Sequence, residues 1–448
     1  MTDVPSRCDT CGIREIPKLA AQSGMRRIRP AIRNLTEHGA AQLEKITRKR
    51  KLRANWPLWS NTPHIKVAAQ GRLCAETVDV LIVGAGIGGA LMALALAKRN
   101  MKILAVDRRG PAKGSTLAST AMIQHEIDVP LHRLSTMIGR DKARRAWQRS
   151  ARAVETLVTL VGNLGINCRL ERKKSLYLSG NDYGARALRL EADARQTAGI
   201  SARFLKSACL RDEFGLNRTA AIESNVSASA NPAQLTAGLW HKVQNDGVSL
   251  VAATEITDVR SVGEWNAVAT SNGEIIQARH VVFCTGYEFL DAVADQGHRM
   301  VSTWALATQP HHPRPDWLKN HVVWEASDPY LYFRSTMDGR LIVGGEDEES
   351  ATAFADPLKL ESKSKTLRAK LSALLNVEIG EPDYIWAAPF GTTADGLPII
   401  GAVPGLNNVY AVMGYGGNGI TYSQIAAEIV SSAILGHRDP DNELFAFR

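Results

Sequence analysis

Residues 78–107 constrain the fold of this chain more than any other segment. An apolar, β-branched run from Val80 to Val83 leads into four glycines within six residues, and an apolar helical pattern follows. A second apolar run, Ile103 to Val106, then ends at Asp107. This order of strand, glycine turn, helix, strand and acid is typical of a dinucleotide-binding βαβ unit.

The spacing gives each glycine a physical role. Gly84 permits the tight turn, Gly86 has no Cβ to keep a pyrophosphate from the backbone, and Gly89 lets the helix pack close to the strand. The helix N-terminus offers unpaired N–H groups and a partial positive charge to the phosphates. Asp107, 18 residues after Gly89, is placed to accept hydrogen bonds from a ribose hydroxyl.

Two other interpretations of this segment stay open. Val80 to Ala97 is 18 residues without a charge, which is the lower limit for a membrane span. The β-branched start and the glycine cluster fit a buried strand and turn better, so we expect no membrane span. The other alternative is a degenerate unit of the same fold that binds nothing.

Composition indicates a large globular protein. The 448 residues are too many for one simple core and suit two intertwined domains, and the apolar and charged fractions of 45% and 22% are ordinary. The six cysteines form no disulfide framework and the first thirty residues lack an apolar segment, which together predict a cytoplasmic location. Cys8 and Cys11 form a CxxC, but no second ligand pair follows, so no metal site is expected.

The net charge of +9 lies almost entirely in residues 1–54, which hold 13 Lys or Arg and 5 Asp or Glu. We interpret residues 1–54 as a basic, flexible extension. Binding of nucleic acid or an anionic surface is the alternative, but the segment has little aromatic interleaving and no recognisable nucleic-acid fold, so nucleic acid is not expected as a partner. Acidic residues within it argue against an organelle transit peptide.

The rest of the chain alternates between helical crossovers and strand-rich stretches. Helical periodicity covers Leu131 to Leu164, Pro357 to Leu375 and Ile420 to Leu435, whereas the small polar residues 222–232 predict a loop or domain crossing. Antiparallel hairpins dominate from residue 298 onward. The fold class expected is α/β: a Rossmann-like domain interleaved with an α+β domain.

Four further motifs follow the βαβ unit in a fixed order. They are Gly114–Thr120, Cys284–Gly286, Thr393–Gly401 and the glycine loop Gly414–Ile420. This ordered set resembles the D-amino-acid oxidase superfamily of FAD enzymes, which includes glycine and sarcosine oxidases and the γ-glutamylputrescine oxidase type. The resemblance covers roughly residues 55–445.

The resemblance implies FAD as cofactor and a division into two domains. Residues 55–165, 231–297 and 383–448 would form the FAD-binding domain, and residues 166–230 and 298–382 a substrate domain built on a mainly antiparallel sheet. The second glycine loop would direct N–H groups and a helix dipole at the edge of the flavin ring that becomes anionic on reduction. The residues expected to bind FAD are Gly84, Gly86, Ile87, Gly88, Gly89, Asp107, Arg108, Gly114, Ser115, Thr116, Ser119, Thr120, Glu255, Ile256, Thr285, Gly286, Gly414, Gly416, Gly417, Asn418, Gly419 and Ile420.

The substrate side departs from the amino-acid oxidases. In glycine-oxidase-like members an arginine between the Trp and Asp-Gly landmarks clamps the substrate carboxylate, and here Phe390 occupies that position. Arg334 is a possible replacement, because Tyr332 and Arg334 would share one face of a strand with Tyr330. His125 follows the Ser/Thr motif and is a candidate base or site of a covalent flavin link. The candidate catalytic residues are therefore Arg334, Tyr332 and His125.

The function expected is oxidation of a CH–NH bond of an amine or amino acid, with hydride transfer to flavin N5 and hydrolysis of the imine. Related oxidases use a lysine near the flavin to promote reaction with oxygen, and the comparable stretch His298 to Trp304 has none. Oxygen or another acceptor therefore stays open, and a dehydrogenase feeding a quinone or carrier is the main alternative. A flavoprotein hydroxylase and a non-enzymatic Rossmann protein with a nucleic-acid-binding arm are weaker ones.

Overall fold

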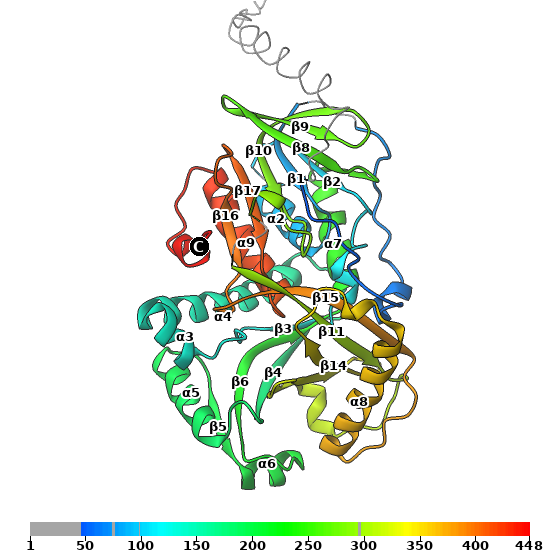
Figure 1. Ribbon diagram of the computed structural model, residues 1–448, viewed down its shortest axis with the longest axis vertical. Coiled ribbons are helices and arrows are strands. Elements are labelled where there is room, and N and C mark those ends of the chain that lie inside the picture. The colour runs from blue at the N-terminus through cyan, green and yellow to red at the C-terminus, as the bar shows by residue number, and fades with distance from the viewer. Residues whose placement is uncertain (1–45, 74–76, 98, 294–296) are drawn as a thin grey trace, which may run out of the picture. The chain divides into compact units, whose positions relative to one another are not determined.

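Two β-sheets organise the part of the chain that the computed structural model describes, which is residues 46–73, 77–97, 99–293 and 297–448 (Figure 1). The first sheet has the strand order β16-β17-β10-β1-β2-β7, and the hairpin of β8 and β9 continues from β10. Its strands are β1 (Thr77–Val83), β2 (Ile103–Asp107), β7 (Ser249–Ala252), β8 (Ile256–Val262), β9 (Trp265–Thr270), β10 (Ile275–Phe283), β16 (Ile399–Ala402) and β17 (Val409–Met413).

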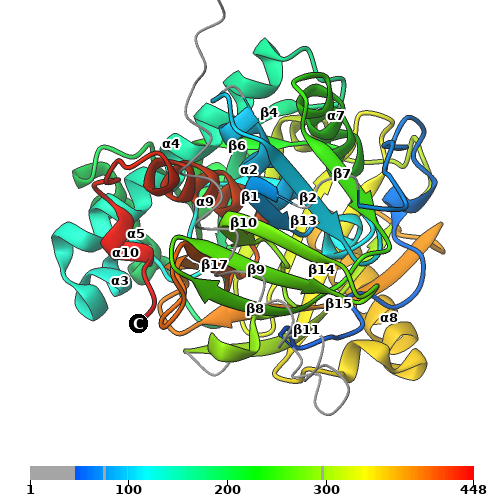
Figure 2. The ribbon, with the colours of Figure 1, turned by 90° about the horizontal axis from the view of Figure 1, so that it is seen from above.

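The first sheet is parallel from β17 to β7 and has β1 at its centre. Because β1 has partners on both edges and cover on both faces, its sequence is almost continuously apolar. Val80 and Ile82 pack in the core on one face, and Leu81 and Val83 in the core on the other. Figure 2 shows α2 (Ile87–Ala97) and α9 (Gly419–Ile434) along one side of this sheet, with β8 and β9 on the other.

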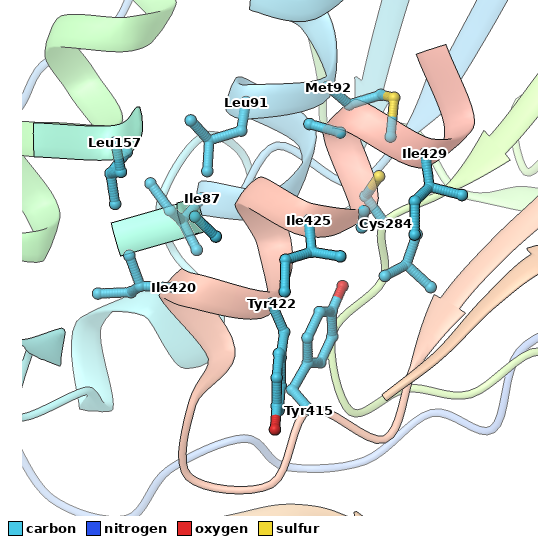
Figure 3. Close-up of a cluster of buried hydrophobic side chains, with 14 of the residues drawn as sticks. Ile87, Leu91, Met92, Leu157, Cys284, Tyr415, Ile420, Tyr422, Ile425 and Ile429 are labelled. Atoms are coloured by element: carbon cyan, nitrogen blue, oxygen red, sulfur yellow. The ribbon is translucent and has the colours of Figure 1, made fainter. Parts of the chain in front are cut away.

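The core on the helical side joins segments that are far apart in sequence. Figure 3 shows this cluster, to which α2 contributes Leu91, α9 contributes Ile425 and α4 (Arg140–Asn163) contributes Leu157. Each fully buried aliphatic side chain of this kind stabilises the fold by about 1.5–3 kcal/mol. Since α2 contacts the sheet, α9 and α7 (Pro232–Asn245), it is apolar around most of its circumference.

The second sheet is mainly antiparallel and has the order β15-β11-β14-β13-β12-β4-β6-β3, with β5 also paired to β6. Only the β12–β4 pair within it is parallel. Its strands are β3 (Met122–Gln124), β4 (Glu171–Ser179), β5 (Arg203–Lys206), β6 (Ala220–Ser229), β11 (His298–Ala307), β12 (His321–Ala326), β13 (Leu331–Ser335), β14 (Leu341–Glu348) and β15 (Tyr384–Thr393).

The remaining helices are short, apart from α8. They are α3 (Leu131–Ile138), α5 (Ala185–Thr197), α6 (Ser207–Phe214), α8 (Pro357–Leu375), α10 (Asn442–Phe445) and the 3-10 turns Leu58–Asn61, Ser115–Ala118, Asp291–Val293, Asp316–Asn320 and Ala353–Ala355. The predicted α/β class, with a Rossmann-like sheet and a mainly antiparallel second sheet, is confirmed. No helix in the described residues is both long and apolar enough to cross a membrane.

The predicted loop over residues 222–232 is wrong, because β6 extends to Ser229. Ser224, Ser227 and Ser229 are buried in β6, which pairs with β4 and is contacted by α4 and α5. Strand formation here is imposed by pairing with β3, β4 and β5, so local composition did not reveal it.

The domain boundaries stay a prediction. On sheet pairing alone, β3 and β15 belong with the second sheet, although both fall in ranges assigned to the FAD-binding domain. The chain therefore passes between the two sheets at these strands.

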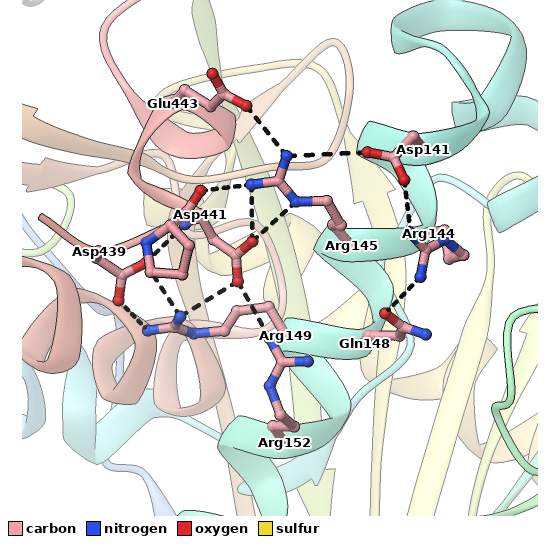
Figure 4. Close-up of polar contacts among 10 residues, drawn as sticks. Asp141, Arg144, Arg145, Gln148, Arg149, Arg152, Asp439, Asp441 and Glu443 are labelled. Atoms are coloured by element: carbon pink, nitrogen blue, oxygen red, sulfur yellow. Dashed lines mark hydrogen bonds and ion pairs between the residues drawn. The ribbon is translucent and has the colours of Figure 1, made fainter.

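A group of ion pairs ties α4 to the C-terminal segment (Figure 4). Arg149 pairs with Asp439 at 2.9 Å and with Asp441 at 3.3 Å, and the three side chains are at most 10% exposed. Arg145 adds a 3.1 Å pair to Asp441. Removing one partner from a buried pair leaves the other charge without compensation, which is the costly way to break it.

We expect Arg149→Met to lower the stability of the protein by about 3 kcal/mol, because Asp439 stays buried without the arginine that pairs with it, while Asp441 keeps its pairs with Arg145 and Arg152. The midpoint of thermal or urea denaturation measures this. Arg144→Ala is the matched control on the same helix, since its pair with Asp141 is exposed and should contribute at most about 1 kcal/mol. Equal midpoints for the two variants would contradict the assignment.

Candidate active site

The glycine turn after β1 is fixed by close backbone contacts. A Cβ on Gly89 would lie 1.8 Å from the carbonyl oxygen of Gly84, and a Cβ on Gly84 would lie 2.4 Å from that of Cys284. Gly84 also has a φ of +110°, which favours glycine. Gly86 differs, because a Cβ there would meet only the Thr116 hydroxyl, at 3.1 Å. Close backbone packing thus requires glycine at positions 84 and 89, whereas the missing Cβ of Gly86 leaves space in front of the Thr116 hydroxyl.

Asp107 holds this turn from the end of β2. One carboxylate oxygen accepts the N–H of Ala85 at 2.7 Å, and the other accepts those of Arg109 and Gly110, also at 2.7 Å. The carboxylate also lines the cavity described below, so it remains open to a ribose hydroxyl. The ribose contact itself stays a prediction.

A cavity of about 560 Å³ begins at this turn and has walls from both sheets. It brings together most of the residues expected to bind FAD. These lining residues are Gly84, Gly86, Ile87, Gly88, Asp107, Arg108, Gly114, Ser115, Thr116, Ser119, Thr120, Glu255, Ile256, Thr285, Gly286, Gly416, Gly417, Asn418, Gly419 and Ile420. Gly89 and Gly414 lie outside the lining; a Cβ on Gly414 would meet the Thr393 side chain at 3.0 Å, so it too serves packing.

The donor groups in this cavity fit a dinucleotide that carries an aromatic ring. The N-terminus of α2 faces the cavity at Gly86, Ile87 and Gly88, and the loop Gly416–Ile420 brings the N-terminus of α9 into the same space. Both are helix ends that favour anionic groups. A ligand with a pyrophosphate and an electron-accepting ring can bind at both helix ends. FAD carries both of these groups.

The Ser/Thr motif is held by three buried donors from separate parts of the chain. Nε1 of Trp386 donates to the Ala118 carbonyl at 2.9 Å, Nε1 of Trp59 to the Ser119 carbonyl at 2.6 Å, and Nε of Arg334 to the Thr120 carbonyl at 2.7 Å. Consecutive carbonyls point away from the cavity into these donors. The arrangement fixes the motif between the two sheets.

Arg334 does not reach the cavity, so its predicted role as a substrate clamp is corrected. Besides Thr120, its guanidinium donates to the carbonyls of Ala230 at 3.0 Å and Ser335 at 3.3 Å, and the side chain is buried. Burial lowers the pKa of Arg334 to about 10. Strand alternation correctly grouped it with Tyr330 and Tyr332, but only the two tyrosines line the cavity.

His125 is also outside the cavity lining, which does not fit a base or a covalent flavin link. The ring is fully buried, its Nδ1 bonds to the Val226 carbonyl at 2.8 Å, and Trp147 packs edge-on at 6.0 Å. Burial lowers the pKa of His125, which favours the neutral ring. Its position is that of a structural histidine between β3 and α4.

Residues 46–55, termed the strap, lie against the cofactor end of the cavity. The N–H of Arg50 donates to Glu288 at 3.0 Å, Lys49 pairs with Glu255 at 2.8 Å, and Arg53 donates to the Gly114 carbonyl at 3.1 Å. The assignment of residues 1–54 to a flexible extension is therefore wrong for residues 46–54; residues 1–45, with Cys8 and Cys11, lie outside the described residues. Acidic residues elsewhere in the fold hold these basic residues in place. The composition of the segment itself does not reveal such distant partners.

Two carboxylates that the sequence interpretation missed face the far end of the cavity. Desolvation raises the pKa of Asp347 to about 7, and the negative charge of Asp128 adds to this, while Thr303 and Tyr330 oppose it. Asp128 is open to the cavity but surrounded by protein, which raises its pKa to about 6; its Oδ2 accepts the N–H of Gly417 at 3.3 Å. Asp347 stands in an acidic run that resembles a solvated turn, so no local signal marked it.

Aromatic side chains form the rest of the wall at the far end of the cavity. Tyr330 and Tyr332 from β13 lie 5.6 Å apart, Tyr177 stacks on Trp324 at 3.9 Å, and Phe390 lines the cavity from β15. Phe390 thus lines the cavity with an uncharged ring; its correspondence to the family's clamp position stays a prediction. The end of the cavity combines aromatic faces with carboxylates.

Comparison with known proteins agrees with this geometry. The model of the DAO family, described as FAD dependent oxidoreductase, matches residues 79–433. Gamma-glutamylputrescine oxidoreductase of Escherichia coli (strain K12) is 21% identical over 376 residues, which are 80% of this chain and 84% of that protein.

Two solved structures share the fold. Glycine oxidase from Geobacillus kaustophilus has a TM-score of 0.67 and 20% identity over 84% of this chain and 99% of its own. L-proline dehydrogenase from P. horikoshii has a TM-score of 0.70 and 20% identity over 83% of this chain and 97% of its own. With the family model covering most of the residues from β1 to α9, the chain belongs to the DAO family of FAD-dependent oxidoreductases.

Proposed function

We propose that this protein oxidises a CH–NH bond of an amine or amino acid. The observation that carries the proposal is the single cavity that joins the glycine turn of the first sheet to the aromatic and acidic wall of the second. The relatives named above are, by their names, enzymes that act on amines or amino acids, which supports the same chemistry here.

The residues of this chain would bind the substrate, orient it and accept the proton of its ammonium group. FAD, when bound, accepts a hydride from the carbon next to the amine nitrogen. Hydride loss requires a neutral amine, and a carboxylate with a pKa near 7 is suited to take the proton from the substrate ammonium at pH 7. Asp347 is that group, and Tyr330 and Tyr332 form aromatic walls that keep water from the amine.

The electron acceptor is a separate question. No lysine is among the described residues that line the cavity, and β11 carries none between His298 and Trp304. Since related oxidases use such a lysine for reaction with oxygen, this observation favours a dehydrogenase that passes electrons to a quinone or carrier as the second candidate function.

Gly86→Ala tests the cofactor site. The added Cβ points at the Thr116 hydroxyl, into space we assign to the pyrophosphate, and we expect roughly tenfold weaker FAD binding. Titration of the apoprotein with FAD, followed by visible absorbance, measures this. Gly162→Ala is the control, because a Cβ there meets nothing within 4 Å in the same fold. Unchanged affinity in Gly86→Ala would contradict the assignment.

The strap makes a second prediction about the cofactor. Deleting residues 1–54 removes the contacts to Glu255 and Glu288 at the cofactor end, so we expect FAD to dissociate at least about tenfold faster. Stopped-flow flavin fluorescence after dilution measures the rate. Deleting only residues 1–45 keeps all of these contacts and is the control. If both deletions retain FAD equally, the strap has no role in cofactor retention.

The acceptor is decided by comparing two reoxidation rates. After reduction by substrate without oxygen, we expect a soluble quinone to restore the flavin absorbance at least about tenfold faster than air-saturated buffer, because no lysine cation stabilises developing superoxide charge. Stopped-flow absorbance in the visible band gives both rates. Faster reoxidation by oxygen, with stoichiometric peroxide, would assign the protein as an oxidase instead.

A further inference from the structure

The charged residues on the substrate side of the cavity are almost all acidic. We define the substrate-side wall as the cavity-lining residues of the second sheet and its loops. Its charged members are Asp182, Arg299, Glu325, Asp328, Asp347, Glu348 and Glu349. An anionic group entering here meets a negative field unless these charges are paired.

Ion pairs account for four of these seven residues. Glu325 pairs with Arg218, Glu348 with Lys363 at 3.1 Å, and Glu349 with Arg299. Arg299 is the one cation of the wall in the described residues, and both side chains of its pair with Glu349 are exposed. The wall, as far as the structure describes it, therefore holds no uncommitted arginine or lysine for a substrate carboxylate. Phe390, which the sequence resemblance puts at the family's clamp position, lines the cavity without a charge.

The other three carboxylates, Asp182, Asp328 and Asp347, have no ion pair within the described residues. Asp347 is distinct because it lines the cavity with Thr303 and Tyr330 beside its carboxylate, and its buried Oδ1 atom has no hydrogen-bond partner among the described residues. A carboxylate in the cavity wall without an ion pair can take a cationic donor from the ligand. Tyr330 and Tyr332 lie beside it, and their ring faces attract cations.

We propose that the substrate is a cationic amine without a carboxylate, of the diamine or polyamine class, and that Asp347 binds its reacting ammonium end. This inference rests on the proposed oxidation of amines and specifies its substrate. Asp347 binds this end as the ionised carboxylate, and transfer of one ammonium proton to Asp347 then leaves the neutral amine that can lose hydride.

The second positive charge has partners at the opening of the cavity. Asp182 and Asp328 are exposed, line the cavity and come from neighbouring loops after β4 and β12, which are adjacent parallel strands. Asp128, which lies with Asp347 at the far end, adds a further carboxylate from the segment after β3. Together they produce a negative field that attracts dications and repels zwitterions with a terminal carboxylate.

Three probes of equal chain length test the proposal: 1,4-diaminobutane, butylamine and 4-aminobutanoate. Each is added to the FAD-loaded protein, binding is measured by calorimetry, and flavin bleaching is followed without oxygen. We expect binding in the order diamine, monoamine, amino acid, with at least about 30-fold between the first and the last. The binding measurement does not depend on turnover.

Asp347→Asn keeps the shape of the side chain but removes its charge, and we expect it to bind the diamine roughly 30-fold more weakly. Asp316→Asn, an exposed carboxylate outside the cavity lining, is the control and should bind it like the unaltered protein. If Asp347→Asn does not fold, the double variant Asp182→Asn with Asp328→Asn replaces it. That variant should lose the preference for diamine over butylamine.

The outcomes separate this inference from the proposed function. Tight diamine binding without bleaching by any amine supports the cation site and contradicts amine oxidation. Bleaching by 4-aminobutanoate or α-amino acids as fast as by the diamine overturns the cation site and leaves amine oxidation standing. Diamine affinity unchanged in Asp347→Asn, or no diamine binding to the unaltered protein, also overturns it.

Discussion

The close approach of α2 to β1 is the constraint on which the rest of the structure depends. Since a Cβ at Gly89 would lie 1.8 Å from the Gly84 carbonyl, the helix can start at this point only with glycine there. This contact places the N-terminus of α2 directly after the central strand, between the ends of β2 and β10. Asp107 then secures the turn from β2 by accepting the Ala85 N–H. These few contacts shape the cofactor end of the cavity.

The second sheet is joined to the Ser/Thr motif by buried hydrogen bonds rather than by apolar packing alone. Trp59, Trp386 and Arg334 donate to consecutive carbonyls of the Ser/Thr motif. Arg334 is costly to bury, but it donates to three backbone carbonyls that would otherwise lack donors in the interior. Its role is to position the motif between the sheets, which explains why an arginine on the tyrosine face of β13 does not bind ligand.

Charge is distributed differently at the two ends of the cavity. At the cofactor end, Glu255 pairs with Lys49 of the strap and Glu288 with Arg109 just after β2, which brings the N-terminal basic run onto the folded body. At the substrate end, Asp128 and Asp347 face the cavity without an ion pair within the described residues, and the surrounding protein raises the pKa of both. The ion pairs at the cofactor end hold the strap in place, whereas the unpaired carboxylates at the substrate end are available to bind a ligand.

The sequence by itself determined the fold class, the cofactor and most of the residues that line the glycine-turn end of the cavity, because glycine spacing and strand periodicity are local properties that one kind of turn and helix start requires. It also identified Phe390 as an uncharged replacement at the clamp position. The tertiary structure alone decided that β6 is a strand, that the strap is docked, that Arg334 and His125 point away from the cavity, and that Asp347 points into it. These features depend on which distant segments meet in the fold. A small polar stretch forms a strand only beside its pairing partners. A carboxylate becomes a candidate ligand group only where folding places it in a cavity wall without an ion pair.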